Sequence, residues 1–160
     1  MNSCTLAVTV ENQPGVLTRV ASLFRRRGYN IESLAVGATH DPSVSRMTLV
    51  VQGESVVLEQ VTKQLYKLVE VIKVVDISTT DSVNRELALV KIKAEPGDRT
   101  EIAQMANIFR ANIVDISRNS LIVEVTGDER KIDALMEALR PFGIIEMVRT
   151  GKAAIQRGGK

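Results

Sequence analysis

One short segment of the sequence carries residues that could bind a small zwitterion. It reads Glu11-Asn12-Gln13-Pro14-Gly15-Val16-Leu17 and lies between an alternating apolar stretch and a helical pattern. Gly15 permits close backbone approach, and the free N–H groups of the first helical turn suit a carboxylate. Amide oxygens of Asn12, and of Asn30 further along the chain, could accept from an ammonium group. Together these groups predict a site for a free amino acid.

The side chains that most enzymes use are scarce. Cys4 is the only cysteine and His40 the only histidine, so neither an internal disulfide nor a Cys/His zinc site can be assembled. No acidic cluster has the spacing of a metal-binding loop. We therefore expect no active site in this chain, and no metal or cofactor bound to it.

Composition describes an ordinary globular chain. Of its 160 residues, 44% are hydrophobic and 25% charged, and 21 basic residues nearly balance 19 acidic ones. This balance indicates neither a nucleic acid nor a membrane partner. No apolar run approaches the roughly 20 residues of a membrane span, and the start lacks the features of a signal peptide. A cytoplasmic location is expected.

The chain contains two copies of one pattern. At an offset of 82 residues the matching pairs are Pro14-Gly15 with Pro96-Gly97 and Asn30-Ile31 with Asn112-Ile113. Beyond the middle of each copy the offset falls to 74, as in Gly53 and Gly127. The second copy has therefore lost residues, and the His40–Ser43 hairpin is the segment where deletion costs least.

Periodicity predicts the same six elements in each copy. Strands are expected over residues 6–10, 31–36, 47–51 and 71–77, then 87–93, 113–117, 121–125 and 144–149. Helices are expected over 16–27 and 58–68, then 101–110 and 131–139. The fold class is α+β, with two tandem ferredoxin-like βαββαβ units of four antiparallel strands and both helices on one face. We expect domains over 4–79 and 86–150, a linker over 80–85 and a flexible tail over 151–160.

One face of each predicted sheet is left without helices. Strands rich in valine, isoleucine and leucine would expose apolar surface there. Covering several hundred Å² of it, at about 25 cal/mol per Å², favours association by several kcal/mol. We therefore expect a homo-oligomer.

The second copy differs at the loop that matters for binding. Ala94 stands where the first copy has Asn12, and Asp98 where it has Val16. An acid at the helix start would repel a ligand carboxylate or cap the helix itself. Only the first copy is predicted to bind an effector.

Three segments of the sequence resemble one known family. They are 10–17, read above, then Arg26-Arg27-Gly28-Tyr29-Asn30-Ile31-Glu32-Ser33-Leu34, and Ser45-Arg46-Met47-Thr48. The chain is similar over nearly its whole length to the small regulatory subunit of acetohydroxyacid synthase (acetolactate synthase), whose first half is an ACT domain. Gln13-Pro14 departs from the more polar pair that is frequent in bacterial members, and the proline stiffens the loop.

The resemblance implies a function in branched-chain amino-acid biosynthesis. It implies a homodimer that binds valine at the seam between the loop of one protomer and the Asn30 region of its partner. It also implies a large catalytic subunit, carrying thiamine diphosphate, magnesium and FAD, which this chain activates and subjects to feedback inhibition. Asn12, Gly15 and Asn30 match the family's effector positions, and the expected neighbours of the ligand are Gln13, Pro14, Val16, Leu17 and Ile31.

Other functions of this fold class fit the residues less well. An acylphosphatase-type enzyme needs an arginine in the loop after the first strand, and residues 11–15 contain none. An RNA-recognition module needs aromatic residues on the sheet, whereas the aromatics here fall on helices and turns. A copper or zinc carrier needs a Cys-x-x-Cys pair. An amino-acid-sensing transcriptional regulator needs a DNA-binding element, and no helix-turn-helix or basic stripe flanks the copies.

Overall fold

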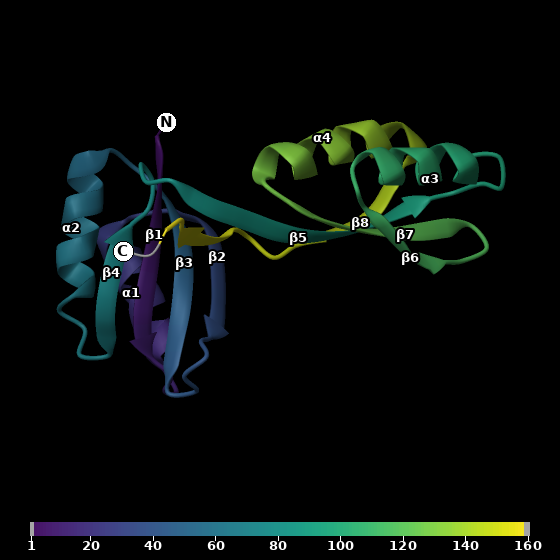
Figure 1. The fold of residues 1–160 in the computed structure, drawn as a ribbon. Helices are drawn as coiled ribbons and strands as arrows, with labels where there is room; N and C mark the ends of the chain where they lie inside the picture. Colours follow the sequence, from purple (N-terminus) through teal and green to yellow (C-terminus); the bar gives the residue numbers. More distant parts are fainter. Residues whose placement is uncertain (1, 159–160) are drawn as a thin grey trace. The chain divides into compact units, whose positions relative to one another are not determined.

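The computed structural model describes residues 2–158, which form two compact units. One unit takes the residues up to Val83 together with Lys152 and those after it, and the other takes Asn84–Gly151. In each unit two helices lie on the same face of an antiparallel sheet, as Figure 1 shows. The predicted pair of ferredoxin-like units is confirmed.

The N-terminal unit has the order βαββαβ. Its elements are β1 (Ser3–Glu11), α1 (Val16–Arg27), β2 (Ile31–Ala38), β3 (Val44–Gln52), α2 (Ser55–Leu65) and β4 (Val71–Asp76). The strands lie in the order β2-β3-β1-β4, and every neighbouring pair is antiparallel. The helix-facing side chains of β1 and β3 alternate with outward-facing ones, so one buried core forms between sheet and helices.

Helix α1 begins and ends where glycines permit a left-handed backbone. Gly15 precedes it with φ 85°, and Gly28 follows it with φ 71°. At the C-terminal end, the N–H of Tyr29 donates to the carbonyl of Phe24, which closes the helix. The predicted helix end at Gly28 is confirmed. Helix α2 begins and ends three residues before its predicted bounds, and two further turns carry the chain to Leu68.

The C-terminal unit repeats this order. Its elements are β5 (Ser82–Lys93), α3 (Arg99–Ile108), β6 (Asn112–Ile116), β7 (Ser120–Gly127), α4 (Glu129–Leu139), a short 3-10 turn η1 (Arg140–Phe142) and β8 (Ile144–Arg149). The strands lie in the order β6-β7-β5-β8, and β9 (Ala153–Gln156) also pairs with β5. Residues 80–85 were predicted to form a linker, but the structure has strand from Ser82 onward. Polar residues can join a sheet because the pairing uses backbone groups.

The segment predicted as a flexible tail, 151–160, contains strand β9, and residues 159 and 160 lie outside the described part. β9 lies across the face of the first sheet that α1 and α2 leave open (Figure 1). Ala154 is buried against Ala7 and Ile77. Its N–H donates to the Thr48 hydroxyl at 3.4 Å, and its carbonyl accepts from Arg46 at 2.8 Å. This face is consequently partly covered by the chain itself.

Small outward-facing side chains let β9 approach the sheet closely. Ala7 and Thr48 lie opposite each other on β1 and β3, and both are almost fully buried. A larger side chain in β9 would have no room unless the strand moved away from the sheet.

Within residues 2–158, none of the helices is long and apolar enough to cross a bilayer.

We predict that Ala154→Leu loosens β9. Because the buried methyl group fills its site, the larger side chain should lower the free energy of opening this segment by about 1–3 kcal/mol. Ala153→Leu is the matched control, since Ala153 is exposed and should change the value by less than about 0.5 kcal/mol. Amide hydrogen exchange of β9 measures both, and equal protection in the two variants would contradict the packing described here.

Candidate functional site

The loop between β1 and α1 presents unpaired backbone donors. The N–H of Val16 donates to the Gln13 carbonyl at 3.4 Å, and that of Arg19 to Gly15 at 3.0 Å. Within the described part of the chain, the N–H groups of Leu17 and Thr18 make no backbone hydrogen bond. The first turn contains no acidic residue. The start of α1 is therefore a ready donor site for an anion.

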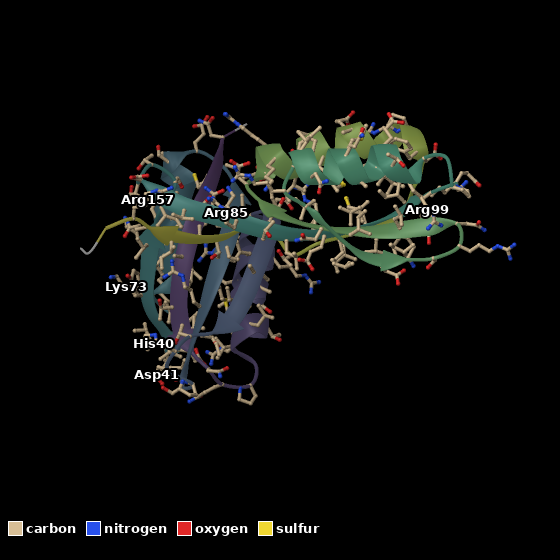
Figure 2. The ribbon with its side chains drawn as sticks, turned by 45° about the vertical axis from the view of Figure 1, so that its right-hand side comes forward. His40, Asp41, Lys73, Arg85, Arg99 and Arg157 are labelled. Atoms are coloured by element: carbon tan, nitrogen blue, oxygen red, sulfur yellow. The ribbon has the colours of Figure 1, made fainter. Side chains whose placement is uncertain are left out.

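Asn12 ties this loop to the β2–β3 hairpin. Its N–H donates to the Ser43 carbonyl at 2.8 Å, and its side-chain amide donates to the Pro42 carbonyl at 2.9 Å. Figure 2 labels His40 and Asp41 at the tip of the same hairpin. Asp41 accepts from both the N–H and the hydroxyl of Ser43, and these bonds hold the pKa of Asp41 below its usual range. Asn12 thus positions the loop, a role that its sequence context did not reveal, and its amide oxygen remains available.

The other loop residues divide between core and surface. Val16 is buried among the core residues beneath α1, so it anchors the loop rather than lining a ligand site. Gln13 and Pro14 are exposed. Leu17 is 43% exposed although it is a large apolar residue. Its side chain is free to contact the hydrocarbon part of a ligand or a partner.

An ion pair fastens the start of α1 to the start of β4. Arg19 pairs with Glu70, whose side chain is only 14% exposed. The backbone carbonyl of Glu70 also accepts from the N–H of Glu11 at 2.9 Å. Sequence reasoning missed both members, because nothing in the spacing of Arg19 and Glu70 shows that they meet.

Asn30 and Ile31 lie at the beginning of β2. The Asn30 carbonyl accepts from the N–H of Gln52 at 3.2 Å, and its side-chain amide donates to the Gln52 side chain at 3.4 Å. Gln52 in turn donates to Glu32 at 2.7 Å. Ile31 is half-buried against the core. Gln52 therefore orients Asn30, and only the strand register, which the sequence does not give, could have identified it.

One chain does not bring the two halves of the predicted site together. Glu11, at the loop end of β1, lies opposite Val44. Ile31 lies opposite Val51 at the other end of the same strand. Seven residues along β3 correspond to about 24 Å at roughly 3.4 Å per residue. A single amino acid cannot touch the loop and Asn30 of the same chain.

The corresponding loop of the C-terminal unit is built differently. Gly97 lacks the positive φ of Gly15. Asp98 precedes α3 but makes no side-chain capping bond. Arg99, labelled in Figure 2, donates from its guanidinium to the carbonyls of Ser117 and Arg118 at 2.5 and 2.7 Å. This loop therefore differs from the first one in two ways: Asp98 adds an acid, and Arg99 binds the β6–β7 hairpin of the same unit.

No cluster of metal ligands accompanies the loop. Among residues 2–158, no group of three histidine, cysteine, aspartate or glutamate side chains is placed to hold a metal ion. The thiol of Cys4 donates to the carbonyl of Gly53 at 3.6 Å, beside the start of α2. The loop before α1 offers backbone N–H groups and the Asn12 amide, which suit the binding of a small polar ligand.

Family models match both units of the chain. An AHAS small subunit-like ACT domain matches residues 6–73, and a domain described as the small subunit of acetolactate synthase matches residues 85–158. The chain belongs to the acetolactate synthase small-subunit family. Its N-terminal unit is the ACT domain of that family, which confirms the resemblance seen in the sequence.

Relatives of the acetolactate synthase small-subunit family align over nearly the whole chain. A "probable acetolactate synthase small subunit" of Archaeoglobus fulgidus is 59% identical and covers 98% of both chains. The acetolactate synthase small subunit of Mycobacterium leprae is 55% identical, over 96% of this chain and 91% of its own. The crystal structure of the small subunit from Thermotoga maritima superposes with a TM-score of 0.94 at 40% identity, covering 100% of both chains. Family and fold are therefore shared along the full length.

We predict that Gly15→Ala destabilises the ACT domain. A Cβ at this position meets no atom within 4 Å, so the cost arises from the left-handed backbone and should be about 1–2 kcal/mol. Gly97→Ala is the matched control, because Gly97 is equally open but has no positive φ, and it should be neutral or slightly stabilising. Urea unfolding of the two variants tests this, and equal midpoints would contradict the loop geometry.

Proposed function

We propose that this chain is the regulatory subunit of acetolactate synthase, and that its ACT domain binds valine or another branched-chain amino acid. The observation that carries the proposal is the loop before α1, with its left-handed Gly15 and the unpaired N–H groups of Leu17 and Thr18. These donors suit the ligand carboxylate, and the exposed Leu17 suits an aliphatic side chain. Only the first of the two units has this combination.

A second copy of the chain supplies the other half of the proposed site. The loop and Asn30 lie at opposite ends of one sheet. In a symmetric dimer whose sheets meet side by side in opposite directions, the loop of one protomer faces Asn30 of its partner. The amide oxygen of the partner's Asn30 then accepts from the ligand ammonium group. The ligand bridges the two protomers, so it stabilises the dimer geometry that holds it.

Catalysis belongs to a large partner subunit in this proposal. That partner carries thiamine diphosphate, magnesium and FAD, and it condenses two pyruvates in the cytoplasm. The small subunit activates it, and bound valine reduces that activation as feedback inhibition. Coupling of this kind is typically about 1–3 kcal/mol, and it acts in both directions between effector and partner.

Calorimetric titration with valine tests the proposed effector. The wild-type protein should release or absorb heat with one site for each protomer, and Gly15→Asp should abolish binding because its carboxylate occupies the anion site. Aspartate tolerates positive φ better than most residues, so the fold should persist. Gly97→Asp is the control and should bind as the wild type does. Absence of binding at millimolar valine in the wild type would contradict the proposal.

Mixing two inactive variants tests whether the site is shared. Gly15→Asp and Asn30→Ala should each fail to bind valine as homodimers. In a mixed dimer one seam carries both substitutions and the other carries neither, so random exchange should restore about a quarter of the wild-type sites. No restoration after exchange, with dimers confirmed by ultracentrifugation, would contradict a site shared between two protomers.

Assay of the large subunit tests the regulatory role. Its acetolactate formation should rise when the wild-type small subunit is added and should fall again with valine. With Gly15→Asp the stimulation should remain while the valine response disappears. A large subunit indifferent to the wild-type protein would contradict the role proposed here.

A further inference from the structure

The C-terminal ends of α1 and α2 border a basic groove. Its cavity has a volume of about 420 Å³. The residues that line it, named here the α1–α2 groove, are Leu23, Arg26, Arg27, Gln64, Lys67 and Leu68. Three of the six are cations and none is acidic, so the groove concentrates positive charge on a chain whose net charge is only +2.

These cations lack the acidic partners that other cations of the same unit have. Arg19 pairs with Glu70, and Lys63 pairs with Glu59 at 2.8 Å. Throughout residues 2–158, no carboxylate lies within ion-pair distance of Arg26, Arg27 or Lys67. Their charge is therefore unbalanced locally and available to a partner.

The helix dipole accounts for only part of this charge. Cations are favoured in the last turn of a helix, which explains Arg26 and Arg27 at the end of α1. Lys67 lies beyond the end of α2, in a separate turn, and faces the same groove. Positive charge from the end of α1 and from the turn after α2 therefore meets in one groove. The dipole of a single helix does not explain this arrangement.

We propose that the α1–α2 groove docks an acidic segment of the catalytic large subunit, an inference that rests on the function proposed above. Guanidinium groups bind carboxylates through two parallel hydrogen bonds, and two adjacent arginines with a lysine fit several carboxylates in sequence. Half-buried Leu68 gives the groove apolar surface that a side chain between the acids can cover, whereas Leu23 lies beneath it in the core. The amide of Gln64 adds a neutral donor and acceptor.

The position of the groove links docking to the effector site. Helix α1 has the effector loop at its start and the groove at its end. Arg27 is three residues before Asn30, and Gly28 and Tyr29 between them form the helix cap. A docked segment therefore lies next to the Asn30 half of the effector site. A change in dimer geometry at Asn30 would then change the surface to which the large subunit binds.

Charge reversal in the full-length protein tests the proposal. Binding of the large subunit is measured by calorimetry for the wild type, for Arg26→Glu/Arg27→Glu, and for the control Arg118→Glu/Arg130→Glu. The control arginines are exposed on the C-terminal unit, and neither is part of a salt bridge in the described chain. The groove variant should raise Kd roughly tenfold or more, whereas the control should stay within about twofold of the wild type. Wild-type binding should also weaken between low and high salt, with a smaller salt dependence in the groove variant.

Valine binding by the same variants separates the two proposals. The groove variant should keep the wild-type valine affinity, and its midpoint of unfolding should fall only slightly, because two acids replace cations that are favoured at a helix end. Arg26→Lys/Arg27→Lys should keep that midpoint at the wild-type value and restore part of the partner affinity, since lysine keeps the charge without the paired hydrogen bonds. An unchanged Kd for the large subunit in the groove variant overturns the docking surface and leaves the proposed function standing. Failure of the wild-type protein to bind the large subunit at all overturns the proposed function instead.

Discussion

The geometry of one sheet separates the two halves of the proposed effector site. The strand register places Glu11 and Ile31 at opposite ends of β3, and the twelve-residue helix α1 spans the distance between the loop and Asn30. A ligand that needs both groups must therefore lie between two chains. In the proposed function this constraint makes association a condition for binding, and it gives the amino acid a way to act on dimer geometry and, through it, on a catalytic partner.

The same unit occurs twice, with different consequences. In the first copy a left-handed glycine and an acid-free helical turn leave backbone donors open. In the second copy the equivalent glycine is not left-handed, and Arg99 reaches the carbonyls of its own hairpin. The two copies share one architecture, whereas the loops before their first helices differ, so fold alone does not decide function.

Much of this structure could be predicted from the sequence, and the reasons are local. Glycines at positions 15 and 28 mark both ends of α1, and alternation of apolar residues marks the strands. The internal repeat then fixed the order of elements in both units. The loop at 12–17 was singled out because Gly15 allows close backbone approach at the donor end of a helix. Glycine and asparagine also serve turn geometry alone, so the family resemblance added the argument for binding.

The rest depended on long-range pairing. The strand at Ala153–Gln156 has no apolar alternation. It is held by pairing with β5, by burial of Ala154, and by hydrogen bonds to Thr48 and Arg46, more than a hundred residues away. The bonds from Asn12 to the hairpin and from Asn30 to Gln52 likewise require a known register. Local sequence patterns do not predict these hydrogen bonds, because each bond joins two segments that are distant in the sequence.

A crystal structure of the protein with saturating valine tests the central claim most directly. The account predicts a carboxylate within hydrogen-bond distance of the N–H groups of Leu17 and Thr18, with the side chain of Asn30 from the second protomer at the ammonium group. Valine bound elsewhere, or a dimer in which the loop of each chain lies far from the second chain's Asn30, would contradict it.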